Sequence, residues 1–160
     1  MRLSAAPAGR TLSAQRWGCW CYLNSIPVGE EVDIDTFGIG PGGIFSINAK
    51  YHRGARIWVG GDTIMVNGAR QPYVRNSRRE AQRASRLLRR AIGEPVMVQG
   101  LVVPVAANTF TVREQPMDVY VINRVRLARR LRTLPDRIDL STVERVFDAA
   151  RLSSTWMPSS

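Results

Sequence analysis

The stretch from Val96 to Val105 most constrains the fold of this chain. It is mostly apolar at both even and odd positions. Side chains alternate between the two faces of a strand, so such a segment is typical of a strand buried on both faces. Strands precede it, and helical patterns stand before and after it. This order predicts an α/β (α+β) fold, a mixed central sheet with flanking helices.

The first half of the chain predicts a meander of strands separated by turn residues. Pro41-Gly42-Gly43 and Asn67-Gly68 are sequences that favour tight turns. The strands are expected at residues 21–26, 32–39, 44–51, 56–59 and 63–66. A further strand is expected at residues 118–122.

The hydrophobic period changes to that of a helix at Ser77. Small or apolar residues then recur at steps of four and three up to Ala91. Asn76 or Ser77 is expected to cap this helix, and Gly93 to end it.

Two shorter helices are expected near the end of the chain. Asn123 opens a basic helix that runs to about Leu134. Ser141 and Glu144 have the spacing of a capping box, which predicts the start of the last helix at Ser141. At 160 residues the chain has the length of one domain of ordinary size. We expect a poorly ordered arm at residues 1–16, a core at 17–122 and a helical extension at 123–160.

The charge of the chain is strongly positive and is supplied almost entirely by arginine. The formal net charge is +10, and Lys50 is the one lysine among 23 Lys and Arg residues. Such a charge predicts a polyanionic partner, in particular nucleic acid. No apolar run is long enough to cross a membrane, so we expect a soluble, cytoplasmic protein. Cys19 and Cys21 are too few for a zinc site and are interpreted as packing residues.

Arginines gather on the long predicted helix. Several of them recur at helical spacing, away from the small and apolar stripe. Such a row can follow a phosphate backbone, and the chain shows no signal of base readout, so we expect DNA binding without sequence readout. The alternative is a solvated face in an arginine-rich protein. The candidate nucleic-acid-binding residues are Arg75, Arg79, Arg83, Arg86 and Arg90.

The turn at Pro41 to Gly43 brings three polar residues together. It pairs the strand that carries Asp35 with the strand that carries Asn48 and Lys50, and register places Asp35 within reach of both. Asn48 and Lys50 share the polar face of their strand, and the other face is expected to enter the core. Oxygens of Asp35 and Asn48 can bind Mg²⁺ or Mn²⁺, and the Lys50 ammonium can orient water or offset charge on a phosphate. A plain ion pair between Asp35 and Lys50 is the simpler alternative.

Several motifs resemble the nuclease-related domain (NERD) family, a branch of the PD-(D/E)XK nuclease superfamily. Each motif alone is weak, but their combined spacing over residues 21–122 is fairly specific. The resemblance implies a core of order α, β, β, β, α, β and a role in DNA processing by metal-dependent hydrolysis. The motifs are Asp33-Ile34-Asp35, Gly40-Pro41-Gly42-Gly43-Ile44-Phe45, Ile47-Asn48-Ala49-Lys50, Gly54, Trp58-Val59-Gly60-Gly61-Asp62, Val66-Asn67-Gly68 and Gln71-Pro72-Tyr73.

The chain departs from the family pattern at two points. Asn48 stands where the family usually has an acid before x-Lys, and a neutral amide brings no charge to a metal. The family's N-terminal helix has no counterpart, so the core is expected to have a truncated N-terminal helix. Three functions therefore stay open: a nuclease with Asp35, Asn48 and Lys50 as catalytic residues, a nucleic-acid-binding module that has lost hydrolysis, and a protein interaction domain.

Overall fold

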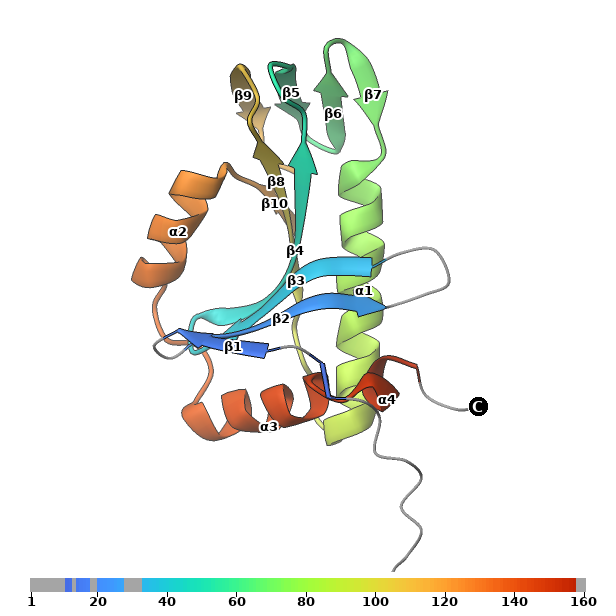
Figure 1. Ribbon diagram of the computed structural model, residues 1–160, viewed down its shortest axis with the longest axis vertical. Helices are drawn as coiled ribbons and strands as arrows, with labels where there is room; N and C mark the ends of the chain where they lie inside the picture. The colour runs from blue at the N-terminus through green and yellow to red at the C-terminus, as the bar shows by residue number, and fades with distance from the viewer. Residues whose placement is uncertain (1–10, 13, 18–19, 28–32, 158–160) are drawn as a thin grey trace, which may run out of the picture.

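A computed structural model describes residues 11–12, 14–17, 20–27 and 33–157. In this part of the chain, strands form two sheets and four helices pack around them (Figure 1). The larger sheet has the order β1-β2-β3-β4-β8-β10, antiparallel from β1 to β4 and parallel from β4 to β10. Its strands are β1 (Ala14–Trp17), β2 (Trp20–Pro27), β3 (Asp33–Gly40), β4 (Gly43–Tyr51), β8 (Gln99–Val105) and β10 (Val119–Val121).

The smaller sheet has the order β7-β6-β5-β9 and extends from one end of the larger sheet (Figure 1). Its apolar face shares a core cluster with Val74 and with Val102, Val119 and Val121 of the neighbouring elements. The strands are β5 (Arg56–Gly60), β6 (Thr63–Val66), β7 (Ala69–Gln71) and β9 (Thr109–Glu114).

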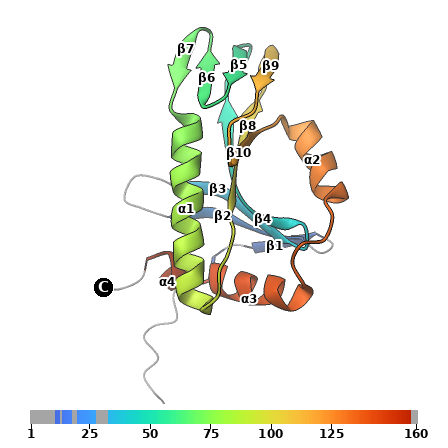
Figure 2. The same ribbon diagram turned by 180° about the vertical axis from the view of Figure 1, so that it is seen from behind.

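Helices cover both faces of the larger sheet (Figures 1 and 2). On one face, α1 and α3 bury apolar residues such as Leu88 and Phe147 against β2, β3 and β4. On the other face, α2 buries Leu127 against β4 and β8. The helices are α1 (Tyr73–Ile92), α2 (Arg124–Thr133), α3 (Leu140–Ala150) and the short α4 (Ser153–Trp156).

The α/β class is therefore confirmed, and so is the strand buried on both faces. Leu101, Val103 and Val105 of β8 face the α2 side, whereas Val102 packs in the cluster with the smaller sheet. The strand begins at Gln99, later than the expected Val96, because the residues before it have no strand partner.

The predicted start of α1 is wrong. The helix begins at Tyr73 after Pro72, and no side chain caps it. The stripe of buried residues extends one turn further back through Val74, so burial and not a capping side chain sets the start. The predicted end is confirmed, since Gly93 adopts a φ of 77° and its N–H donates to Arg89 O.

The prediction that a capping box at Ser141 starts the last helix is also wrong. Asp139 caps α3, and its Oδ1 accepts hydrogen bonds from Thr142 N at 2.7 Å and from Ser141 Oγ at 2.9 Å. Glu144 instead pairs with Arg16 of β1 at 3.0 Å. In contrast, Asn123 caps α2 as expected, accepting from Arg126 N.

Three short strands were not predicted from the pattern of the sequence. β7 follows the expected strand at 63–66, β9 lies between the expected strands at 96–105 and 118–122, and β1 begins inside the expected arm and ends at Trp17. β1 is a short edge strand, and near it Leu12 N donates to Arg151 O at 2.7 Å. These contacts correct the expectation that all of residues 1–16 form a poorly ordered arm.

Some sequence expectations fall on residues whose structure is not described. Residues 1–10 and Cys19 lie outside the described residues. Cys21 packs in the core at 2% exposure. Among the described helices, none is both long and apolar enough to span a membrane.

Candidate functional site

The β3–β4 hairpin brings Asp35 and Asn48 into direct contact. Regular pairing ends at Thr36 opposite Ile47, and continuing that register by one residue places Asp35 opposite Asn48. Beyond that point side chains replace the backbone ladder. Asp35 N donates to Asn48 Oδ1 at 3.2 Å, and Ala49 N donates to Asp35 Oδ2 at 3.0 Å. These bonds fix the two side chains at the same edge of the hairpin.

The polar face of β4 does not face solvent, because α1 covers it. Ser46 and Asn48 are 0% and 4% exposed. The opposite face, with Phe45 and Ile47, packs under α2 as part of the core. Both faces of β4 are therefore buried up to Asn48, and Asp35 lies at the exposed margin.

Glu80 of α1 meets Asn48 beneath the helix. Asn48 Nδ2 donates to Glu80 Oε2, and the Glu80 side chain is only 7% exposed. Burial raises the pKa of the Glu80 carboxyl, the Asn48 hydrogen bond and the charge of Lys50 oppose that rise, and the charge of Asp35 adds to it. Glu80 is thus electrostatically coupled to all three residues predicted from the sequence.

Lys50 points to the start of α1. Its Nζ lies over the Tyr73 ring, 4.7 Å from the centroid, in a cation–π contact. His52 stacks on the same ring, and its Nε2 lies 2.7 Å from Tyr73 Oη. The first residue of α1 therefore holds the ammonium near the hairpin edge, and His52 also supports Tyr73.

Sequence reasoning overlooked Glu80 and Tyr73. A usable signal for Glu80 is present, since it follows Ser77 by three residues and precedes Ala84 by four. It therefore belongs to the buried stripe and not to the row of arginines around it. An acid at a buried helical position of so basic a chain is unusual. Tyr73 gives no such signal, because only the start of α1 places it beside Lys50.

The five candidate arginines all lie on α1 and are all exposed. Arg78, on the same helix, is half-buried and forms ion pairs with Asp62 at 2.9 Å and Asp118 at 2.8 Å. It links α1 to the neighbouring loops, whereas the five candidates Arg75, Arg79, Arg83, Arg86 and Arg90 lie on the exposed surface of the helix.

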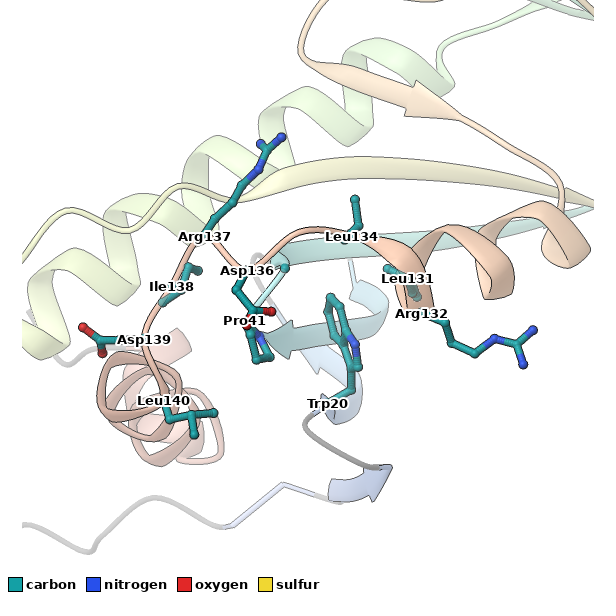
Figure 3. A pocket seen from close by; sticks show the side chains of 11 residues that line it. Trp20, Pro41, Leu131, Arg132, Leu134, Asp136, Arg137, Ile138, Asp139 and Leu140 are labelled. Carbon is teal, nitrogen blue, oxygen red and sulfur yellow. The ribbon is translucent and has the colours of Figure 1, made fainter.

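A pocket of about 550 Å³ lies elsewhere, between the β3–β4 turn and the segment that joins α2 to α3 (Figure 3). Trp20, Pro41 and Leu131 are among its lining residues, and none of the site residues above contributes to it. Pro41 O accepts from Arg137 N at 2.7 Å and Ile138 N at 3.0 Å. The glycine-rich turn at this point is therefore an anchor for the C-terminal helices.

The oxygen donors at the hairpin edge suit a hard cation. Asp35 and Glu80 carry carboxylates, and Asn48 has a carbonyl oxygen, while no soft ligand lies among them. Among the described residues, no group of three or more His, Cys, Asp and Glu forms a ready metal cluster. Two carboxylates, with water and substrate phosphate completing the shell, are the set that Mg²⁺ commonly uses.

Comparison with known families decides the relationship. The sequence model of the nuclease-related domain family matches residues 8–105, more than half of the chain. The chain belongs to the nuclease-related domain family. The match includes the hairpin with Asp35, Asn48 and Lys50, and α1 with Glu80 and the arginine row. No curated protein and no solved structure gives a significant match. In this member of the nuclease-related domain family, Asn48 contacts a buried acid, Glu80, on the neighbouring helix.

Proposed function

We propose that this protein hydrolyses phosphodiester bonds of nucleic acid, DNA in particular, with Mg²⁺ or Mn²⁺. The observation that carries the proposal is the contact of Asp35 with Asn48 at the hairpin edge, with Lys50 two residues further along the same face of β4. Membership of the nuclease-related domain family supports a nuclease-type role for this edge.

Each residue has a distinct part in the proposed reaction. Asp35 is the main ligand of the cation, and Asn48 contributes a neutral oxygen. Lys50 bears a compact charge on a long stem, which suits contact with a phosphate oxygen or the attacking water. The Tyr73 ring restricts where that ammonium can lie. The bound cation would lower the pKa of a water molecule and offset charge on the phosphate in the transition state.

The exposed arginines of α1 support a polyanionic substrate. Cations on one helix face can contact successive phosphates, which gives affinity that does not depend on base sequence. We therefore propose duplex DNA without sequence readout as the substrate to examine first.

Cleavage of supercoiled plasmid by the purified protein, with Mg²⁺ or Mn²⁺ and with EDTA as the control, tests this function. Lys50→Ala should slow cleavage about 100-fold, the usual effect of removing one group that stabilises transition-state charge. Arg53→Ala, an exposed cation on the following turn, is the matched control and should cleave like the unmodified protein. Undiminished cleavage by Lys50→Ala would overturn the role of Lys50.

A second function is a binding module that has lost hydrolysis. Its support is that Asn48 is neutral and that its Oδ1 already accepts a bond from Asp35 N. This version predicts salt-dependent DNA binding without cleavage under any metal condition. An affinity that does not change with salt would contradict phosphate contacts, and absence of nucleic-acid binding at low salt would favour a protein interaction domain.

A further inference from the structure

Glu80 is the only charged side chain in the buried class among the residues that the structure describes. Removing a carboxylate from water costs several kcal/mol in free energy unless charges or hydrogen bonds compensate. The direct contact that Glu80 receives comes from a neutral amide, that of Asn48. The buried Asn48 amide needs an acceptor at this position, but a neutral side chain such as Gln would supply one without the cost of burying a charge, so packing alone gives no reason for an acid.

The Asn48 amide is oriented by its two neighbours. Its Oδ1 accepts from Asp35 N, so its Nδ2 is the atom left to donate to Glu80. An ionised acid at position 48 would have no hydrogen to donate and would place a second negative charge against Glu80. The amide at position 48 and the acid at position 80 are thus complementary. An ionised acid at either position satisfies the contact only when the other position holds an amide.

The position of Glu80 is also set by the packing of α1 on the sheet. Ser77, one turn before Glu80, lies so close to Gly100 of β8 that a methyl group at Gly100 would overlap Ser77 Oγ. Gly100 is paired with Ser46 of β4, one alternation from Asn48 on the same face. This close approach sets how near α1 lies to the sheet and where Glu80 stands along β4.

We propose that Glu80 supplies the second carboxylate of the metal site, in place of the acid missing at position 48, and that Asn48 is the positioning residue that holds it. The two cation-binding carboxylates then come from β3 and α1, and β4 contributes the neutral Asn48 oxygen and the Lys50 ammonium. This inference rests on the proposed metal-dependent function. It explains why a chain that lacks the usual acid keeps both a buried acid and the single lysine at the same edge.

The test measures Mn²⁺ binding by calorimetry and plasmid cleavage in the same four proteins. These are the unmodified protein, Glu80→Gln, the double variant Asn48→Asp with Glu80→Gln, and Glu114→Gln. Glu80→Gln should weaken Mn²⁺ binding at least tenfold and lower cleavage with it. The double variant should recover both, because Asp and Gln restore one acid and one amide with the contact reversed. Glu114 is an exposed acid on β9, and its variant should match the unmodified protein.

The outcomes separate this inference from the function on which it rests. Unchanged Mn²⁺ affinity in Glu80→Gln would overturn the inference even if plasmid is cleaved. Mn²⁺ binding that depends on Glu80, without cleavage, would support the inference and overturn hydrolysis. Absence of Mn²⁺ binding by the unmodified protein would overturn both. If Glu80→Gln alone is poorly folded, recovery of Mn²⁺ binding in the double variant still supports the inference. A folded double variant that does not recover Mn²⁺ binding would contradict the reciprocal pairing of positions 48 and 80.

Discussion

α1 and α2 are both rich in arginine, yet they lie on opposite faces of the larger sheet and differ in what they bury (Figures 1 and 2). α1 buries seven residues, including the polar pair Ser77 and Glu80, while α2 buries only Leu127. α1 lies on the face of β4 that carries Asn48, and α2 lies on the face that carries Phe45.

Arginine content is therefore a poor guide to the role of a helix in this protein. In α2, Arg130 stacks on Tyr120 with 4.5 Å between guanidinium and ring centroid, and Arg132 donates to the helix backbone at Ala128 O. These contacts are local. The residue that distinguishes α1 is its one acid, because that acid joins the helix to the hairpin edge.

Gly100→Ala is expected to separate the roles of α1 and α2 most strongly, because it should lower both the free energy of unfolding and the Mn²⁺ affinity. The added methyl would force α1 away from β8 at Ser77, and overpacking of this kind costs about 2 kcal/mol in free energy of unfolding. Because Glu80 moves with the helix, Mn²⁺ affinity should fall as well. Leu127→Ala, beneath α2, should also lower the free energy of unfolding, by at least about 2 kcal/mol, and leave Mn²⁺ affinity unchanged. Urea unfolding and calorimetry measure the two effects, and equal loss of Mn²⁺ affinity in both variants would contradict the distinction.

Removing three arginines from each helix compares their contributions to DNA binding. Arg79, Arg86 and Arg90 of α1, all exposed, are changed together to Ala, and Arg126, Arg129 and Arg132 of α2 form the charge-matched control. Removal of one cation that binds a phosphate should lower the slope of log affinity against log salt by about 1. We expect the α1 variant to lose on the order of tenfold in affinity at low salt and the α2 variant to lose less. Fluorescence anisotropy over a salt series measures this, and equal losses would mean that only net charge matters.

Asp62→Asn tests whether the link between α1 and its neighbouring loop is structural. The hydrogen bond from Arg78 lowers the pKa of Asp62 below its ordinary value of 3.8. A lowered pKa contributes stability that is present above that ordinary value and is lost as pH falls through the folded-state pKa. Asp62 is 63% exposed, so the variant should lose about 0.5 kcal/mol at pH 7 and nothing once the acid is protonated. Urea unfolding at neutral and acidic pH checks the sign, and a deficit that grows in acid would contradict it.

Arg130→Ala is expected to have the smallest effect. It removes an exposed cation–π contact with Tyr120, which is worth about 0.5 kcal/mol. The loss of DNA affinity should be no larger than the loss caused by removing any other single exposed arginine. A thermal unfolding scan beside an anisotropy measurement checks both, and a loss of affinity as large as that of the α1 triple variant would assign α2 a direct role.

Much of the fold follows from local sequence pattern. The period of the apolar residues predicted the strands from β2 to β6, the long helix and the doubly buried β8, because one element's own residues carry that signal. β7 and β9 were not predicted, since three or six residues of mixed polarity are stabilised by their neighbours in the sheet and not by their own pattern. The prediction of the α3 cap was wrong for a related reason. Asp139 and Ser141 are both residue types that cap helices, and only the course of the preceding chain selects Asp139.

The hairpin part of the candidate site was predicted for the same reason that the strands were. Asp35 and Asn48 are separated by one turn, so local register brings them together to within a residue. Glu80 is 32 positions from Asn48, and its contact depends on how α1 crosses the sheet. A contact between two residues this far apart produces no periodic pattern in a single sequence, so it could not be predicted.

The sequence by itself determined the class of fold, the acid, amide and lysine at one hairpin edge, and the arginine row. Each of these depends on residues that are near neighbours on one strand pair or one helix. Only the tertiary structure decided that the polar face of β4 is covered, because that requires α1 to pack across it with Ser77 against Gly100. The same packing placed Glu80 against Asn48, since a buried acid takes its role from the groups that a distant segment brings to it.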